Sequence, residues 1–330
     1  MNTYFVIVLL GVGLFFLVWA LGWLLEKLSH VLLRTTHEPG TRSWFMLVGP
    51  GVALHETSHY LGCKVTRTEV VEFKPINIEV QDDQVILGYV KYRKPPSSFK
   101  NAIINLAPVM VSLILLIAFA LAATYLVPST PGLGGDALEL ISNLIGAKGN
   151  PDAFYPVTLI LGFVYQFLYT FSELTVINPV FWIVAFLAMT IMFSNAPSDM
   201  DIRNAATGLK VIIIFDIIWL VIAYFLPDAG WILYGLFETL AVLFSLSLAF
   251  AAVGYGFFIL VAAMSKLRSP FQVIPFIACL TTGGLFWYLT GTGELSLSVF
   301  TYALQTIISL GVFIGVTLLM LMIRSLRRSG

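Results

Sequence analysis

Charged residues are scarce in this chain of 330 residues. Asp, Glu, Lys and Arg make up 11% of the sequence, against about 25% in an ordinary soluble domain, and hydrophobic residues make up 58%. So large an apolar surplus cannot be hidden in the core of a soluble domain of this size, and it indicates a protein that is surrounded by lipid. A soluble enzyme and a disordered chain are therefore excluded.

Net charge and cysteine are scarce as well. The 18 basic and 18 acidic residues balance, so the composition predicts no bulk electrostatic partner such as a nucleic acid. Cys63 and Cys279 are too few to form the disulfide framework of a secreted scaffold, and they leave the redox compartment open. The lipid bilayer is the partner that the composition indicates.

Long hydrophobic runs, by contrast, are abundant, and the first, of 22 residues, is long enough to cross a bilayer. They predict an all-α polytopic membrane protein with about eight transmembrane helices, at 4–25, 44–63, 101–127, 179–194, 208–226, 231–264, 271–290 and 297–323. A further run, 156–174, is expected to lie in the interface, to re-enter, or to join 179–194 as one bent helix. A separate crossing there would place the basic residues of 195–210 on the outer side, and Asn178-Pro179 is a natural break.

The polar stretch 64–100 interrupts these runs and contains seven basic residues. Within it, 76–81 alternates with the period of a strand, Asp82-Asp83 offers a turn, and 84–92 is rich in Val, Ile and Tyr. This pattern predicts a small extramembrane β-hairpin within 68–92. Because basic loops tend to stay in the cytoplasm, the hairpin is expected on the cytoplasmic side.

The sequence His55-Glu56-Thr57-Ser58-His59 lies inside the apolar run 44–63. On a helix, positions i and i+4 share one face, so His55 and His59 can hold one zinc ion while Glu56 acts as general base. Titratable groups are costly in a membrane, which favours a functional role for all three.

A catalytic zinc site needs a third protein ligand and an open position for water. The carboxylates of Asp199 and Asp201 are the best candidates, because their segment ends one predicted span and begins a basic loop on the side that the motif helix should reach. From these residues alone, either aspartate could be the third zinc ligand.

These motifs resemble those of the site-two-protease-like intramembrane zinc metalloproteases, over roughly residues 44–205. The resemblance rests on His55–His59 preceded by Gly49-Pro50-Gly51, on Asn195-Ala196-Pro197 followed by an aspartate, and more weakly on Asn105-Leu106-Ala107-Pro108. Strands between the first and second core helices also fit this family. Met200-Asp201-Ile202 stands where the family has Leu-Asp-Gly.

The resemblance implies an intramembrane zinc endopeptidase that cleaves transmembrane or membrane-proximal segments of membrane-protein substrates. It favours Asp201 as the third zinc ligand, since an apolar residue precedes it as in the family, and leaves Asp199 as the alternative. Asn195 and Asn105 become candidate contacts to the substrate or the oxyanion, and the active site is expected to face the cytoplasm. The chain then divides into an N-terminal anchor and polar loop (1–43), a metalloprotease core (44–207) and a C-terminal four-helix membrane region (208–330).

Two other functions are also compatible with the sequence. A membrane metalloprotease of the prenyl-protein-processing kind would take its third ligand from a glutamate, for which Glu173, Glu238 and Glu294 are available. A transporter would instead use the intramembrane acids Asp216 and Glu238 as ion or proton sites.

Overall fold

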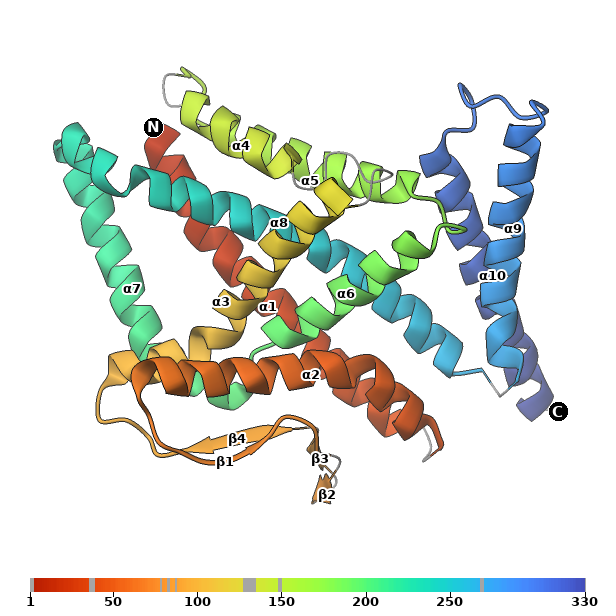
Figure 1. The fold of residues 1–330 in the computed structure, drawn as a ribbon, viewed down its shortest axis with the longest axis horizontal. Helices are drawn as coiled ribbons and strands as arrows, with labels where there is room; N and C mark the ends of the chain where they lie inside the picture. The colour runs from red at the N-terminus through yellow and green to blue at the C-terminus, as the bar shows by residue number, and fades with distance from the viewer. Residues whose placement is uncertain are drawn as a thin grey trace.

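A computed structural model describes residues 3–35, 39–77, 79–81, 84–86, 88–126, 135–147, 150–267 and 270–329 of the protein. The described part is mostly helical, as the hydrophobic runs predict, with four short strands inserted after the second helix (Figure 1). Its elements are α1 (Thr3–Thr35), α2 (Pro39–Thr66), β1 (Val70–Lys74), β2 (Glu79–Gln81), β3 (Gln84–Ile86), β4 (Tyr89–Tyr92), α3 (Ser98–Leu126), α4 (Gly135–Gly146), α5 (Tyr155–Glu173), α6 (Pro179–Asn195), α7 (Asp199–Phe225), α8 (Pro227–Ser265), the short 3₁₀ helix η2 (Phe271–Val273), α9 (Ile274–Gly291) and α10 (Tyr302–Ser329).

Several of these helices are long and apolar enough to cross a membrane, which indicates a multi-pass membrane protein. Within the described residues, five qualify by themselves: Phe5–Leu28, Ser98–Phe119, Phe237–Ser265, Phe271–Gly291 and Tyr302–Arg324. A sixth arises if α6 and the start of α7, which meet at a bend of 56°, count as one broken span. The eight spans expected from the sequence stay a prediction.

The predicted hairpin is present, in two parts. Strand β1 pairs antiparallel with β4, and β2 pairs antiparallel with β3 nearer the tip. The turn expected at Asp82-Asp83 lies outside the described residues. Figure 1 shows the strands beside α2, on the side away from most of the other helices.

Helix α8 runs through the centre of the helical bundle (Figure 1). Aromatic rings fill the space around it: Phe250 is 1% exposed and packs against Phe167 and Phe119 at centroid distances of 5.0 and 5.4 Å. In lipid there is little hydrophobic gain from bringing helices together, so close van der Waals packing of this kind carries much of the cohesion.

Small residues bring α2, α3, α6 and α7 into backbone contact. A side chain at Gly51 of α2 would lie 2.7 Å from the carbonyl oxygen of Thr190 on α6, and one at Gly62 would lie 3.0 Å from Ile104 Cα on α3. Gly208 of α7 packs directly against Ala102 of α3. These approaches, typical of membrane helices, hold the four helices that carry the candidate site.

Helix α5 ends at Glu173, and α6 begins after a short turn that contains the predicted break at Asn178-Pro179. The Asn178 side chain accepts a hydrogen bond from Val180 N at 3.0 Å and so caps α6. In Figure 1, α5 follows α4 along the top of the bundle and α6 then descends steeply toward α2. Helix α4 was not expected from the sequence.

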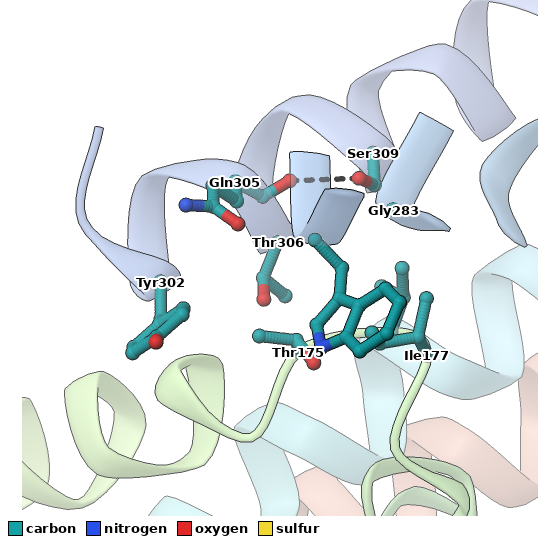
Figure 2. Close-up of a pocket in the computed structure, with 9 residues that line it drawn as sticks. Thr175, Ile177, Gly283, Tyr302, Gln305, Thr306 and Ser309 are labelled. Carbon is teal, nitrogen blue, oxygen red and sulfur yellow. Dashed lines mark hydrogen bonds between the residues drawn. The ribbon is translucent and has the colours of Figure 1, made fainter. Parts of the chain in front are cut away.

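Helices α9 and α10 form a pair at the edge of the bundle and meet the core at the α5–α6 turn (Figure 1). Tyr302, Gln305, Thr306 and Ser309 of α10 line a cavity of about 10 Å³ together with Thr175 and Ile177 of this turn (Figure 2). That volume has room for about one water molecule.

Candidate metal centre

Helix α2 places His55 and His59 one turn apart on the same face. Their rings are nearly perpendicular, with centroids 4.5 Å apart, and their Nε2 atoms lie 2.9 Å from each other. This is the arrangement that the spacing of the H-E-x-x-H motif predicts for a continuous helix.

The other ring nitrogen of each histidine is held by a backbone carbonyl from a neighbouring helix. His55 Nδ1 lies 2.8 Å from Ser194 O of α6, and His59 Nδ1 lies 2.8 Å from Ile104 O of α3. A carbonyl oxygen only accepts hydrogen bonds, so Nδ1 carries the proton in each ring. In the neutral imidazole, Nε2 is then left with its lone pair, which is the form that binds a metal ion.

Asp201, in the first turn of α7, completes the cluster. Its Oδ1 lies 3.1 Å from His59 Nε2, and its Oδ2 lies 3.3 Å from His55 Nε2. The carboxylate is fixed by a capping box, in which Oδ2 accepts hydrogen bonds from Ser198 N and Oγ at 2.8 and 2.7 Å while Asp201 N donates to Ser198 Oγ. A side chain 146 positions from His55 in sequence is thus brought to it and oriented.

The cluster is buried and electron-rich at its centre. The exposed fractions are 7% for His55, 6% for His59 and 5% for Asp201. When both histidines are neutral, two nitrogen lone pairs and a carboxylate point toward one another. These electron-rich groups repel one another unless a proton or a metal ion lies between them. Three ligand atoms around one point suit a metal ion. In a tetrahedral zinc site, Zn–N bonds of about 2.0–2.1 Å put neighbouring ligand atoms about 3.3 Å apart. The separations of 2.9 to 3.3 Å found here are of that size, so the group could hold a metal ion.

Glu56, the residue between the two ligand positions, lies against the β-hairpin. The backbone N–H of Val90 on β4 interacts electrostatically with its carboxylate. Gly88, just before β4, approaches so closely that a Cβ there would lie 3.1 Å from Glu56 Cγ and 2.7 Å from Pro75 O. The hairpin therefore covers the glutamate directly.

The two asparagines expected near the substrate differ in their surroundings. Asn105 is 4% exposed, and its Nδ2 donates to Asn101 O at 2.6 Å and to Tyr92 Oη at 3.2 Å, so its amide links α3 to β4. Asn195 is 1% exposed, and within the described part of the chain neither its Oδ1 nor its Nδ2 has a hydrogen-bond partner. A contact to substrate stays a prediction for both.

Of the alternative ligands, the three glutamates do not join this group. The side chain of Asp199 lies outside the described residues. Glu173 and Glu294 are exposed, Glu238 is buried in α8, and among the described side chains the one metal-suited set of His, Cys, Asp and Glu is His55, His59 and Asp201.

Several groups at the site were not identified from the sequence. The carbonyls of Ser194 and Ile104 and the N–H of Val90 belong to the backbone, so residue type gives no signal for them. Ser198 did have one, because Ser198-x-x-Asp201 has the spacing of a capping box at a helix start.

Comparison with known proteins gave no relatives: no family model, no curated protein and no solved structure matches this chain. Its function therefore has to be inferred from its own residues and their geometry.

Proposed function

We propose that the protein is an intramembrane zinc endopeptidase, with His55, His59 and Asp201 as zinc ligands and Glu56 as general base. The observation that carries this proposal is the convergence of two Nε2 atoms and a carboxylate, each fixed by hydrogen bonds, in a buried pocket beside a glutamate. The resemblance of the motifs to the site-two-protease-like family supports the same function.

Zinc, when bound, would polarise the scissile carbonyl and lower the pKa of a water molecule toward about 7. Glu56 then takes the proton of the attacking water and delivers it to the leaving amine. Its neighbours on α2 are the two histidine ligands, so its carboxylate lies beside the place where that water is needed. Asn195, at the end of α6, has an amide without a hydrogen-bond partner among the described residues and is available to steady the oxyanion or the substrate backbone.

A helical substrate hides its carbonyls in its own hydrogen bonds, so cleavage requires an extended segment. The edge of β4 opposite β1, on which the structure describes no paired strand, can hold one. Arg93 N donates to Glu69 O at 3.0 Å, on the β1 side. Because successive amides of a strand point to opposite edges, those of Tyr92 and Val90 point away from β1, and the electrostatic interaction of Val90 N–H with the Glu56 carboxylate agrees with this.

A cleft of about 260 Å³ lies along this edge of β4. It is lined by Val90 and Tyr92 together with Asn101 of α3 and Asn204 of α7. A substrate strand paired with β4 in this cleft would run past Glu56, so the hairpin both covers the site and offers a template for the unwound substrate.

The arrangement favours this function over the two alternatives. In the prenyl-protein-processing kind of enzyme a glutamate must reach the zinc, whereas here the carboxylate beside the histidines is Asp201. A transporter has no need for two histidines whose Nδ1 atoms are both fixed by carbonyls, an arrangement typical of metal ligands. The basic stretch 64–100 supports a cytoplasmic orientation of the site.

The test is zinc content and proteolysis measured on the same set of detergent-purified variants. Wild type should hold about one zinc per chain, which His55→Ala and Asp201→Ala should lose and Asp199→Ala should keep. Glu56→Gln should keep zinc but produce no new fragment ends within membrane proteins of the expressing cells, and Glu294→Gln, at an exposed site, is the matched control. A folded wild type that takes up no zinc after metal reconstitution would overturn the proposal.

A further inference from the structure

An apolar groove lies between helices α1, α3, α7 and α8, and its lining contains none of the three residues of the His55–His59–Asp201 cluster. Its volume is about 310 Å³, and its walls are almost entirely aliphatic and aromatic side chains such as Phe16, Val109 and Phe244. On α7 the lining includes Leu209, eight positions after Asp201, and Asp216, seven positions further along the helix.

Asp216 is the one titratable side chain among the described residues that line the groove. It is 8% exposed, and in the described part of the chain its carboxylate has neither a hydrogen-bond nor an ion-pair partner. A carboxyl group buried among apolar side chains without a partner is costly, and in a membrane helix such a group marks a functional contact by default. The proposed hydrolysis does not use it.

The position of Asp216 relative to the metal cluster is set by α7. Both Asp201 and Asp216 lie on this one continuous helix, 15 residues apart, so they are separated by about 22 Å along its axis. The groove follows α7 over the later part of that distance. A chain that occupies the groove would therefore lead from the depth of Asp216 toward the site.

We propose that this groove docks the helical part of the substrate's transmembrane segment, and that Asp216 pairs there with a Lys or Arg of that segment. The inference rests on the proposed function and adds a substrate class to it: single-span proteins with an intramembrane basic residue.

Charge complementarity identifies this occupant. An acyl chain would fill the apolar walls but offers nothing to a carboxylate, whereas a basic residue in a substrate helix has the same need of a partner that Asp216 has. Pairing the two satisfies both groups at once.

The geometry also specifies where the basic residue lies. A substrate that is helical throughout covers 22 Å in about 15 residues, and one with about four residues extended at the site covers it in about 10. The basic residue is therefore expected about 10 to 15 residues from the scissile bond.

The test measures binding without cleavage, using full-length Glu56→Gln protein in phosphatidylcholine vesicles. The probes are fluorescent Leu/Ala peptides of about 24 residues that carry one Lys at successive positions. A Lys at the matching depth should tighten binding about tenfold over the Lys-free peptide. The preference should disappear when Asp216→Asn or Asp216→Leu is added, and persist with Glu294→Leu. Adding Asp216→Lys should shift the preference to peptides with a Glu at that depth.

Equal binding of all peptides to all variants would overturn the inference. A second experiment replaces a Phe of the groove by Trp and measures whether brominated lipid quenches its fluorescence. Quenching that no peptide relieves would show that lipid occupies the groove, and would also overturn the inference. Zinc content, read on the same preparations, separates this result from the proposed function. If the protein binds zinc but shows no preference for Lys peptides, the proposed metal centre stands and only the proposed substrate class is wrong. Zinc retention also verifies that each Asp216 variant is folded.

Discussion

Two polar regions of the molecule are buried among apolar helices, yet their polar atoms are arranged differently. One is the candidate metal cluster of His55, His59 and Asp201, on α2 and α7. The other is the polar crevice around the small cavity between the α5–α6 turn and α10. In the cluster, two histidine nitrogens and a carboxylate face one another. In the crevice, donors meet acceptors: Gln305 Nε2 donates to Phe300 O at 2.9 Å and Thr290 Oγ1 at 3.2 Å, and Ser309 Oγ donates to Gln305 O at 2.8 Å. Donors that meet acceptors in this way have a structural role, although the Thr306 hydroxyl of the crevice has no partner among the described residues, whereas converging acceptors call for a cation.

The packing around the two regions differs in the same sense. In the apolar windows of α9 and α10, 17% and 22% of the residues are buried, against 50% for α3 and 56% for α8. A Cβ at Gly284 or Gly311, in α9 and α10, would meet nothing within 4 Å, and the three nearest atoms to one at Gly283 belong to side chains, whereas a Cβ at Gly51 or Gly62 in α2 would lie within 3.0 Å of backbone atoms of a neighbouring helix. The metal cluster is thus built where backbones are locked together, and the crevice lies at the edge of a lipid-exposed helix pair.

The largest expected difference between the regions is their response to zinc. Zinc at a free concentration about 1,000 times its Kd should stabilise the wild type by about 4 kcal/mol, because a ligand that binds only the folded state adds its binding free energy to stability. Chelation should reverse this in thermal unfolding of the purified protein. His59→Ala should lose the response and Thr306→Val should keep it. Equal responses in both variants would show that the cluster does not bind the metal.

Close packing is the second point of contrast. Gly51→Val should destabilise the protein by about 1–3 kcal/mol, since the new side chain has to displace Thr190 O or Phe193 Cβ, which lie 2.7 and 2.5 Å from the Cβ position. It should also weaken zinc binding, because α6 carries the carbonyl that holds His55. Gly256→Val on α8, where nothing lies within 4 Å, is the matched control. Denaturation and zinc titration measure both effects, and equal losses at the two positions would contradict the packing argument.

Sequence reasoning succeeded where the signal is local and failed where it is not. The fixed spacing of His55 and His59 on one helix made the metal motif visible, and the alternation of 76–81 indicated the hairpin. Asp201 could be placed near them only by topology and resemblance. The close approach of Gly88 to Glu56 and the groove beside Asp216 depend on how distant segments pack, and no pattern of residue types in one sequence encodes that.

A smaller effect is expected in the crevice. Gln305→Leu leaves Phe300 O and Thr290 Oγ1 without their donor, and because these two acceptors are only half-buried the cost should lie near the lower end of the about 1–3 kcal/mol expected for unpaired buried groups. Thr306→Val should cost less: the Thr306 hydroxyl, 1% exposed, has no partner in the described chain, so its removal leaves no other group unpaired. Both variants should bind zinc as wild type does. Loss of zinc from Gln305→Leu would show that the two regions are coupled.

The smallest expected effect is a shift in the pKa of Glu72 on β1. Glu72 lies in a half-buried polar cluster of the hairpin, which contrasts with both buried regions. Tyr89 Oη donates to its carboxylate at 2.7 Å and Lys91 Nζ at 3.0 Å, and they lower the pKa of Glu72 from 4.5 to about 2. Because the pKa is lowered on folding, the stabilisation is complete above about pH 4.5 and is lost as the pH falls through about 2. Carbon NMR of the Glu72 carboxyl should show this midpoint, and Tyr89→Phe should raise it without changing zinc content. A wild-type midpoint near 4.5 would mean that these contacts do not persist in solution. A midpoint near 2, together with a zinc content that Tyr89→Phe leaves unchanged, would show that the strand pairing is held independently of the metal cluster.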